Sequence, residues 1–281
     1  MLLLGMGVDW AATTVVGLGV AAMGGIILLN TRRRKRRGET PPPDYRSLLE
    51  THVGFYRALE PGDKDRFATR MEGFLREVRV HGVHISLEDL DRVLVGASAV
   101  IPAFGYREWS YNNLSDVLLY EGAFDQQHFL GPDNRHNVLG MVGSGAMERV
   151  MILSKPSLRS GFDAVRSTAN TGIHEFVHLI DKADGAVDGI PESLLGTSAG
   201  AWTQLVRTYL GAVRTGHTDI NTYAGTNEAE FLAVVSEYFF KRPDLMEQRH
   251  PDLYAMLSHI FQQRPRLDPR AAEAEPGETH A

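Results

Sequence analysis

Cysteine is absent from the 281 residues of this chain. Without thiols the chain can form no disulfide, bind no metal through thiolates and use no cysteine nucleophile. Any metal site must therefore be built from histidine, aspartate and glutamate side chains. The compartment stays open, because a chain without cysteine suits reducing and oxidising surroundings alike.

A strong positive charge is also missing, since the formal net charge is −6 at pH 7. Proteins that bind nucleic acid as their main partner usually present a basic surface, so no nucleic-acid partner is expected. Six basic residues are nevertheless consecutive, at 32–37, directly after the uncharged stretch 11–30. That stretch is long enough to cross the hydrocarbon core of a bilayer as a helix. By the positive-inside rule, its basic end would lie in the cytoplasm.

These features predict one N-terminal transmembrane helix at residues 1–31, retained as an anchor. A cleaved signal peptide is the alternative, but it would carry its positive charge before the apolar region. The expected location is the inner or cytoplasmic membrane, single-pass, with the main domain in the cytoplasm. Residues 32–44 are expected to be a basic, proline-rich juxtamembrane linker. The main domain is assigned to 45–266, and the tail 267–281 is expected to be disordered.

Within 45–266, helical periodicity gives way to short apolar runs and then returns. Helices are expected at 46–58, at 61–78 and from 86 to about 102, and strands at 116–120, 137–142 and 149–153. The third helix is expected to begin at Ser86, with Asp89 completing a capping box. This order predicts an α+β domain with a small sheet beside a helical half.

The motif His174-Glu175-Phe176-Val177-His178 has the HExxH pattern. On a helix, residues four apart share one face, so both imidazoles can reach one ion. Glu175 can act on a water molecule at that ion without being a ligand. Phe176 and Val177 indicate a buried helix, whereas two surface histidines on an ordinary helix are the alternative. Two histidines are too few for a zinc site, so a third ligand must come from elsewhere.

A second helix, expected at 227–240, is apolar on more than one side. Carboxylates in such a helix need a partner, because unpaired charges are rarely buried. Glu230 and Glu237 are seven residues apart and lie on nearly the same face. One could bind the metal while the other forms a hydrogen bond with a side chain that binds the metal. Alternatively, both could make ordinary salt bridges. A glutamate ligand about fifty residues after HExxH is the arrangement of gluzincin metallopeptidases.

These segments resemble the Mlc titration factor A family of zinc-dependent peptidases. The resemblance rests on residues 174–181, 188–191, 223–231 and 236–240. It implies a zincin-like metallopeptidase domain that binds one Zn²⁺ per chain. It also implies that Glu230 is the third ligand rather than Glu237.

The resemblance implies hydrolysis of peptide bonds in a peptide or protein substrate, with Glu175 as the general base. Tyr223, seven residues before Glu230, is expected to donate a hydrogen bond to the developing oxyanion. Asp181 either orients a ligand histidine or caps the helix. The strand at 149–153 is expected to be the sheet edge to which an extended substrate adds.

A function of another class stays open. The namesake of the family binds a transcriptional repressor, which implies a regulatory protein partner as the alternative. In that case the chain would sequester its partner, and the zinc site would be structural or vestigial. Outside the motif, His81 is expected in a turn or short extended piece, and histidines such as His250 are expected at the surface.

Overall fold

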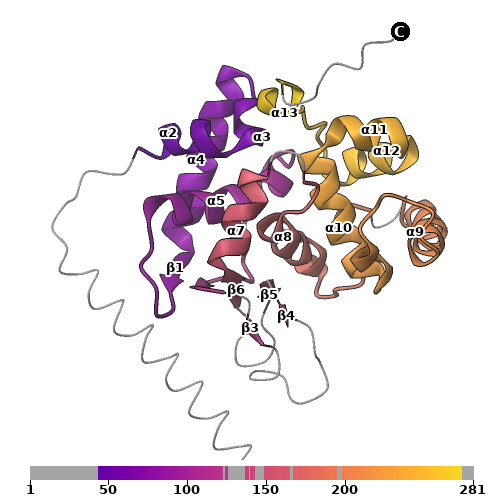
Figure 1. Ribbon diagram of the computed structural model, residues 1–281, viewed down its shortest axis with the longest axis horizontal. Helices are drawn as coiled ribbons and strands as arrows, with labels where there is room; N and C mark the ends of the chain where they lie inside the picture. Colours follow the sequence, from indigo (N-terminus) through magenta and orange to yellow (C-terminus); the bar gives the residue numbers. More distant parts are fainter. Residues whose placement is uncertain are drawn as a thin grey trace, which may run out of the picture. The chain divides into compact units, whose positions relative to one another are not determined.

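The computed structural model describes residues 44–122, 124–125, 137–138, 140–142, 149–164, 167–194 and 198–273 (Figure 1). Contacts group residues 44–124 and 137–281 into one compact unit. The other unit, residues 1–43 with 125–136, lies outside the described residues except for Asp125. The predicted anchor and nearly all of the predicted linker therefore lie outside the described residues.

The predicted membrane location has to be corrected. Within the part of the chain that the structure describes, no helix has both the length and the hydropathy needed to span a bilayer. The stretch 1–31, on which the prediction depended, lies outside that part. Membrane attachment therefore has no support among the described helices.

A four-stranded sheet has the order β1 (Arg79–Gly82), β2 (Asp116–Tyr120), β6 (Val150–Ser154) and β5 (Gly140–Val142). The first three strands are parallel, and β5 runs antiparallel to β6. A separate two-stranded sheet joins β3 (Phe124–Asp125) and β4 (Asn137–Val138). The structure confirms the predicted strand at 116–120 and places the third predicted strand one residue later. The predicted strand at 137–142 is divided between β4 and β5.

The expectation that residues 149–153 form the edge of the sheet is wrong. β6 pairs with β2 on one side and with β5 on the other, in a register that places Val142 opposite Met151. Both backbone edges of β6 are therefore used. β5 is the outermost strand on this side, where it contacts the helix that carries the HExxH motif.

The N-terminal helices are α2 (Tyr45–His52), α3 (Gly54–Arg57), α4 (Pro61–Glu77) and α5 (Asp89–Ala103). The predicted helix at 46–58 is interrupted at Val53, whose backbone is extended (φ −112°, ψ 101°). α4 agrees with its prediction and has proline in its first turn, where no backbone donor is needed. α5 begins later than predicted, because Glu88 and Asp91 form the capping box instead of Ser86 and Asp89.

The second half of the chain is mostly helical. It contains α7 (Lys155–Asp163), α8 (Thr171–Asp181), η2 (Lys182–Asp184), η3 (Glu192–Leu194), α9 (Ala199–Arg214), η4 (Thr222–Gly225), α10 (Glu228–Lys241), α11 (Pro243–Arg249), α12 (Pro251–Ile260) and α13 (Pro269–Glu273). α8 and α10 lie side by side, and α5 also packs against α8 (Figure 1). A Cβ at Gly172 of α8 would lie 2.1 Å from Oγ of Ser98 in α5, so only glycine permits this approach. The predicted α+β architecture is confirmed, with the motif helix at the centre of the packing.

The chain after α12 returns to the N-terminal helices. Asp268 forms an ion pair with Arg57 at 2.5 Å, and both side chains are largely buried. Arg270 in α13 donates to the backbone oxygen of Thr51 at 2.8 Å. The first part of the predicted disordered tail is therefore ordered, while residues 274–281 lie outside the described residues.

Candidate metal centre

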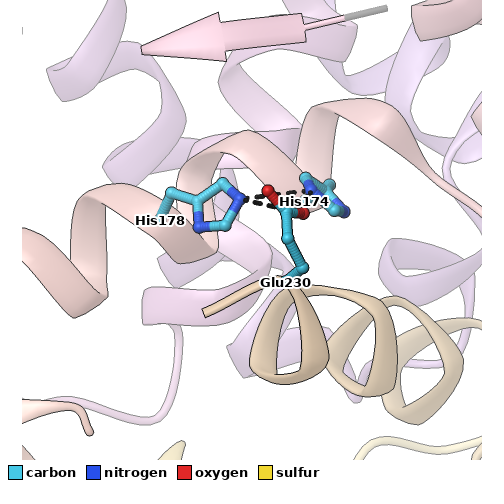
Figure 2. A group of neighbouring side chains, drawn as sticks. All are labelled: His174, His178 and Glu230. Atoms are coloured by element: carbon cyan, nitrogen blue, oxygen red, sulfur yellow. Dashed lines mark hydrogen bonds and ion pairs between the residues drawn. The ribbon is translucent and has the colours of Figure 1, made fainter. Parts of the chain in front are cut away.

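Three side chains converge between α8 and α10 (Figure 2). Nε2 of His174 lies 3.0 Å from Oε2 of Glu230 and 3.2 Å from Nε2 of His178. The third separation, from Nε2 of His178 to Oε2 of Glu230, is 3.6 Å. The structure therefore brings together the three residues that the sequence suggests as metal ligands.

This triangle fits a tetrahedral cation. Zinc bonds of about 2.0–2.1 Å at tetrahedral angles place neighbouring ligand atoms roughly 3.4 Å apart. The three observed separations lie on both sides of that value. Two imidazoles and one carboxylate are also a donor set that zinc favours, and they leave a fourth position for water or substrate. The residues present fit a single metal ion.

Local sequence fixes where both helices begin. Asn170 caps α8, because its Oδ1 accepts a hydrogen bond from the backbone N–H of Ile173 at 3.0 Å. Asn227 caps α10 in the same way and accepts from the N–H of Glu230 at 2.9 Å. Side-chain caps of this kind satisfy donors that a helix start leaves unpaired. The cap of α10 therefore fixes the backbone of Glu230 itself in the first turn.

The electrostatics of the centre favour a cation. Burial raises the pKa of Glu230, but hydrogen bonds from His174 and His178 outweigh this and leave it well below its usual value. Burial alone lowers the pKa of His174, yet hydrogen bonds to Glu230 and Glu237 raise it well above the ordinary value. Two carboxylates thus stabilise positive charge at this point, which a bound metal ion would supply.

Glu237 lies behind His174 and holds it from the other side. Its Oε1 is 2.7 Å from Nδ1 of His174, and its Oε2 accepts a hydrogen bond from the backbone N–H of Asn170. The carboxylate is buried. When the Nδ1–H of a neutral His174 donates to Glu237, the lone pair of Nε2 points to the centre.

Glu175 and Tyr223 lie next to these ligands. Glu175 is only 5% exposed, and burial raises the pKa of its carboxyl group. Tyr223, in η4, is 47% exposed, and its ring centroid lies 6.0 Å from that of His174. Burial of its hydroxyl, together with the charges of Glu230 and Glu175, raises the pKa of Tyr223 to about 12. The hydroxyl therefore keeps its proton at neutral pH and can donate it.

Asp181 does not have either of the partners expected from the sequence. Its Oδ2 accepts from the backbone N–H of Gly189 at 2.9 Å, in the loop after α8. No hydrogen bond joins it to His178 among the described residues. Burial raises the pKa of Asp181 to about 6.

Sequence reasoning missed two residues around the site. Asn170 carries both the cap of α8 and the N–H that binds Glu237. Trp202 donates from Nε1 to the backbone oxygen of Gly189 at 2.6 Å. An asparagine four residues before His174 is a recognisable N-cap signal, whereas nothing local in the sequence indicates the partner of Trp202.

Two histidines away from the centre, His250 and His81, have carboxylate partners that the sequence did not predict. His250 is buried rather than at the surface, and its Nε2 lies 2.6 Å from Oδ1 of Asp219. His81 lies in strand β1, consistent with a short extended piece, and its Nε2 is 2.9 Å from Oδ1 of Asp116.

A profile of the family described as glucose-regulated metallo-peptidase M90 matches residues 28–262. The chain belongs to this family. M90 membership supports a metallopeptidase-type domain, and the His174, His178 and Glu230 cluster is consistent with the metal that such a domain uses.

Similar curated proteins agree with the M90 assignment. Mlc titration factor A of Salmonella schwarzengrund is 28% identical over 239 residues, covering 78% of this chain and 87% of that protein. The protein of the same name in Cronobacter sakazakii is 28% identical over 232 residues, covering 76% and 84%. An uncharacterized protein of Synechocystis sp. is 25% identical over 230 residues, covering 78% and 84%. The resemblance predicted from the sequence is confirmed.

Proposed function

We propose that this chain is a zinc-dependent peptidase that hydrolyses peptide bonds at the centre formed by His174, His178 and Glu230. The observation that carries the proposal is the triangle of ligand atoms, with sides of 3.0, 3.2 and 3.6 Å. A zinc ion held there would polarise the substrate carbonyl and lower the pKa of a water molecule. M90 membership supports the reaction class.

Glu175 is the general base in this proposal. Burial raises the pKa of its carboxyl group, which suits a group that takes a proton from water and delivers it to the leaving amine. Tyr223 remains protonated and is exposed on the side of His174, so it can donate a hydrogen bond to the carbonyl oxygen as negative charge develops. Glu237 holds His174 in the orientation that directs Nε2 to the ligand triangle.

The test combines metal content with peptide hydrolysis by the full-length chain. We expect about one zinc per chain, and cleavage of a mixed peptide library that stops when zinc is removed and resumes when it is restored. The Glu175→Gln variant should retain zinc and lose cleavage, since it removes the base but none of the three ligands. Ser236→Ala serves as the folded and active control, because among the described residues this buried hydroxyl bonds only the backbone of its own helix. A wild-type chain that binds zinc but cleaves no library peptide would contradict the proposal.

A second candidate function comes from the relatives. Several similar proteins carry the name Mlc titration factor A, which describes the titration of another protein. By this analogy the chain would sequester a partner protein, and the metal centre would only stabilise the fold. Two results together would favour this function: the wild-type chain hydrolyses no peptide, and it captures a partner protein as well as Glu175→Gln does.

A further inference from the structure

The C-terminal end of α8 contains a buried carboxylate that has no part in the proposed hydrolysis. Asp181 is the last residue of α8 and follows His178 by three positions, so the two side chains share one face of the helix. Its side chain is fully buried. Oδ2 is occupied by the N–H of Gly189, but Oδ1 has no hydrogen-bond partner among the described residues.

His178 also has a buried polar atom without a hydrogen-bond partner among the described residues. Its Nε2 faces His174 and Glu230, but its Nδ1 is buried without a partner in the described part of the chain. A histidine that binds a metal through Nε2 carries its proton on Nδ1, and that N–H needs an acceptor. Because buried polar atoms are rarely left unpaired, the unpaired nitrogen of His178 and the unpaired oxygen of Asp181, on the same helix face, are candidate partners for each other.

The other oxygen of Asp181, Oδ2, is connected through Gly189 to the start of the helix that carries Glu230. Gly189 has φ of +76°, a left-handed conformation that favours glycine. A Cβ at this position would lie 2.5 Å from the backbone oxygen of Glu228, the first residue of α10. Trp202 donates from Nε1 to the carbonyl oxygen of Gly189, so both the N–H and the C=O of this residue are hydrogen-bonded. The bond from Asp181 to Gly189 therefore holds the loop directly against the helix start that carries Glu230.

We propose that Asp181 is a positioning residue for two of the three ligands of the metal centre. In the zinc-bound protein its Oδ1 accepts the Nδ1–H of His178, a hydrogen bond that this structure does not contain, and its Oδ2 anchors the loop that sets the start of α10. The inference rests on the metal site proposed above and extends it. Glu237 orients His174, and Asp181 does the same for His178 while also bracing Glu230.

Asp181→Asn in the full-length chain isolates the contact with His178. Asparagine has nearly the same shape, and only its oxygen can accept from Gly189, so its NH₂ group must face His178. That group would donate to Nδ1 and so place the histidine proton on Nε2, which opposes metal binding. We expect zinc affinity, measured by competition with a chromogenic chelator, to fall about 10- to 100-fold. Melting of the metal-free protein should change little, because the bond to Gly189 is retained.

Asp188→Asn is the matched control. Asp188 is exposed in the same loop, and its Oδ1 accepts from the N–H of Ile190. The variant removes the same charge near the centre but touches neither His178 nor Gly189. Its zinc affinity should stay at the wild-type value, and an equal fall in both variants would show that only charge matters and would overturn the proposal.

A measurement on the wild-type chain keeps the proposal testable even if the variant fails to fold. In the zinc-loaded protein labelled with ¹⁵N-histidine, the Nδ1–H protons of His174 and His178 should both exchange slowly with solvent. Rapid exchange at His178, or wild-type zinc affinity in Asp181→Asn, would overturn the role of Asp181 and leave the metal site intact. Full zinc binding by His178→Ala would instead overturn the metal site itself, so the two failures are distinguishable.

Discussion

The two histidines of the motif differ in how the protein holds them. Each ring nitrogen of His174 has a partner, with Glu237 at 2.7 Å from Nδ1 and Glu230 at 3.0 Å from Nε2. His178 is engaged only through Nε2 among the described residues. α10 therefore positions His174 through both ring nitrogens before any ion binds, whereas it contacts His178 only through Nε2. A single motif thus contains one candidate ligand whose Nδ1 has a carboxylate partner and one whose Nδ1 has none among the described residues.

The largest expected effects come from removing each histidine. Either His174→Ala or His178→Ala should weaken zinc binding on the order of a thousandfold, because one of three protein ligands is lost from a binding free energy of about 10 kcal/mol or more. Chelator competition measures this.

The difference between His174 and His178 can be tested in the metal-free proteins. His174→Ala leaves the buried carboxylate of Glu237 without its ion-pair partner and should destabilise the fold by roughly 3 kcal/mol. His178→Ala removes only the longer contact with Glu230, at 3.6 Å, and leaves Glu230 paired with His174, so it should cost clearly less in urea unfolding. Equal losses of stability would contradict the asymmetry.

Tyr223→Phe should reduce kcat about a hundredfold with zinc affinity unchanged, since it removes one donor to the oxyanion and no ligand. Steady-state kinetics on a cleaved peptide, with zinc content measured alongside, separates the two quantities. A fall in zinc content would show that the hydroxyl serves the metal ligands instead.

Glu237→Gln should lower zinc affinity about 10- to 100-fold, because an amide cannot accept from both the Asn170 N–H and the His174 Nδ1–H. Ser236→Ala, its neighbour on α10, is the matched control and should bind zinc as wild type does. If Glu237→Gln binds zinc as tightly as the control, the direct carboxylate partner of His174 contributes nothing to metal binding.

The smallest effect concerns a histidine and carboxylate pair that needs no metal. Burial raises the pKa of Asp116, but hydrogen bonds from His81, Arg79 and Ser115 outweigh it and lower the pKa to about 2. The folded value lies below the unfolded value of about 3.9, so this carboxylate stabilises the fold above about pH 4. That contribution should be lost as the pH falls from about 4 to 2.

Urea unfolding across this range, with a chelator present throughout, measures the loss. Asp116→Asn should make the stability of the chain less dependent on pH in the same range. An identical pH dependence in the variant would show that other carboxylates account for it.

The sequence predicted the metal centre better than it predicted the sheet. Helical spacing singled out His174 and His178, and the buried helix at 227–240 left Glu230 and Glu237 as candidates for the third position. The family resemblance chose Glu230 between these two. Strand order depends on pairing between distant segments, and the alternation of apolar and polar residues along one strand does not specify its neighbours. β5 therefore took the edge position that was expected of β6.

Helix ends and buried partners were also beyond local reasoning. Glu88 rather than Ser86 caps α5, although both choices place an acidic residue three positions later. Asp181 pairs with Gly189, a contact that exists only because the loop after α8 folds back in a left-handed turn. Such contacts are decided by tertiary packing, so a periodicity argument cannot rank them.

The ion pair between Arg57 and Asp268 has a practical consequence for handling the chain. It joins a helix near the start of the described region to a residue near its end, and both partners are largely buried. A version shortened before Asp268 would leave a buried guanidinium without its carboxylate, which is strongly destabilising. Tags and fusion partners are therefore better attached after Glu273, beyond the last residue of α13, than at the boundary of the family match near residue 262.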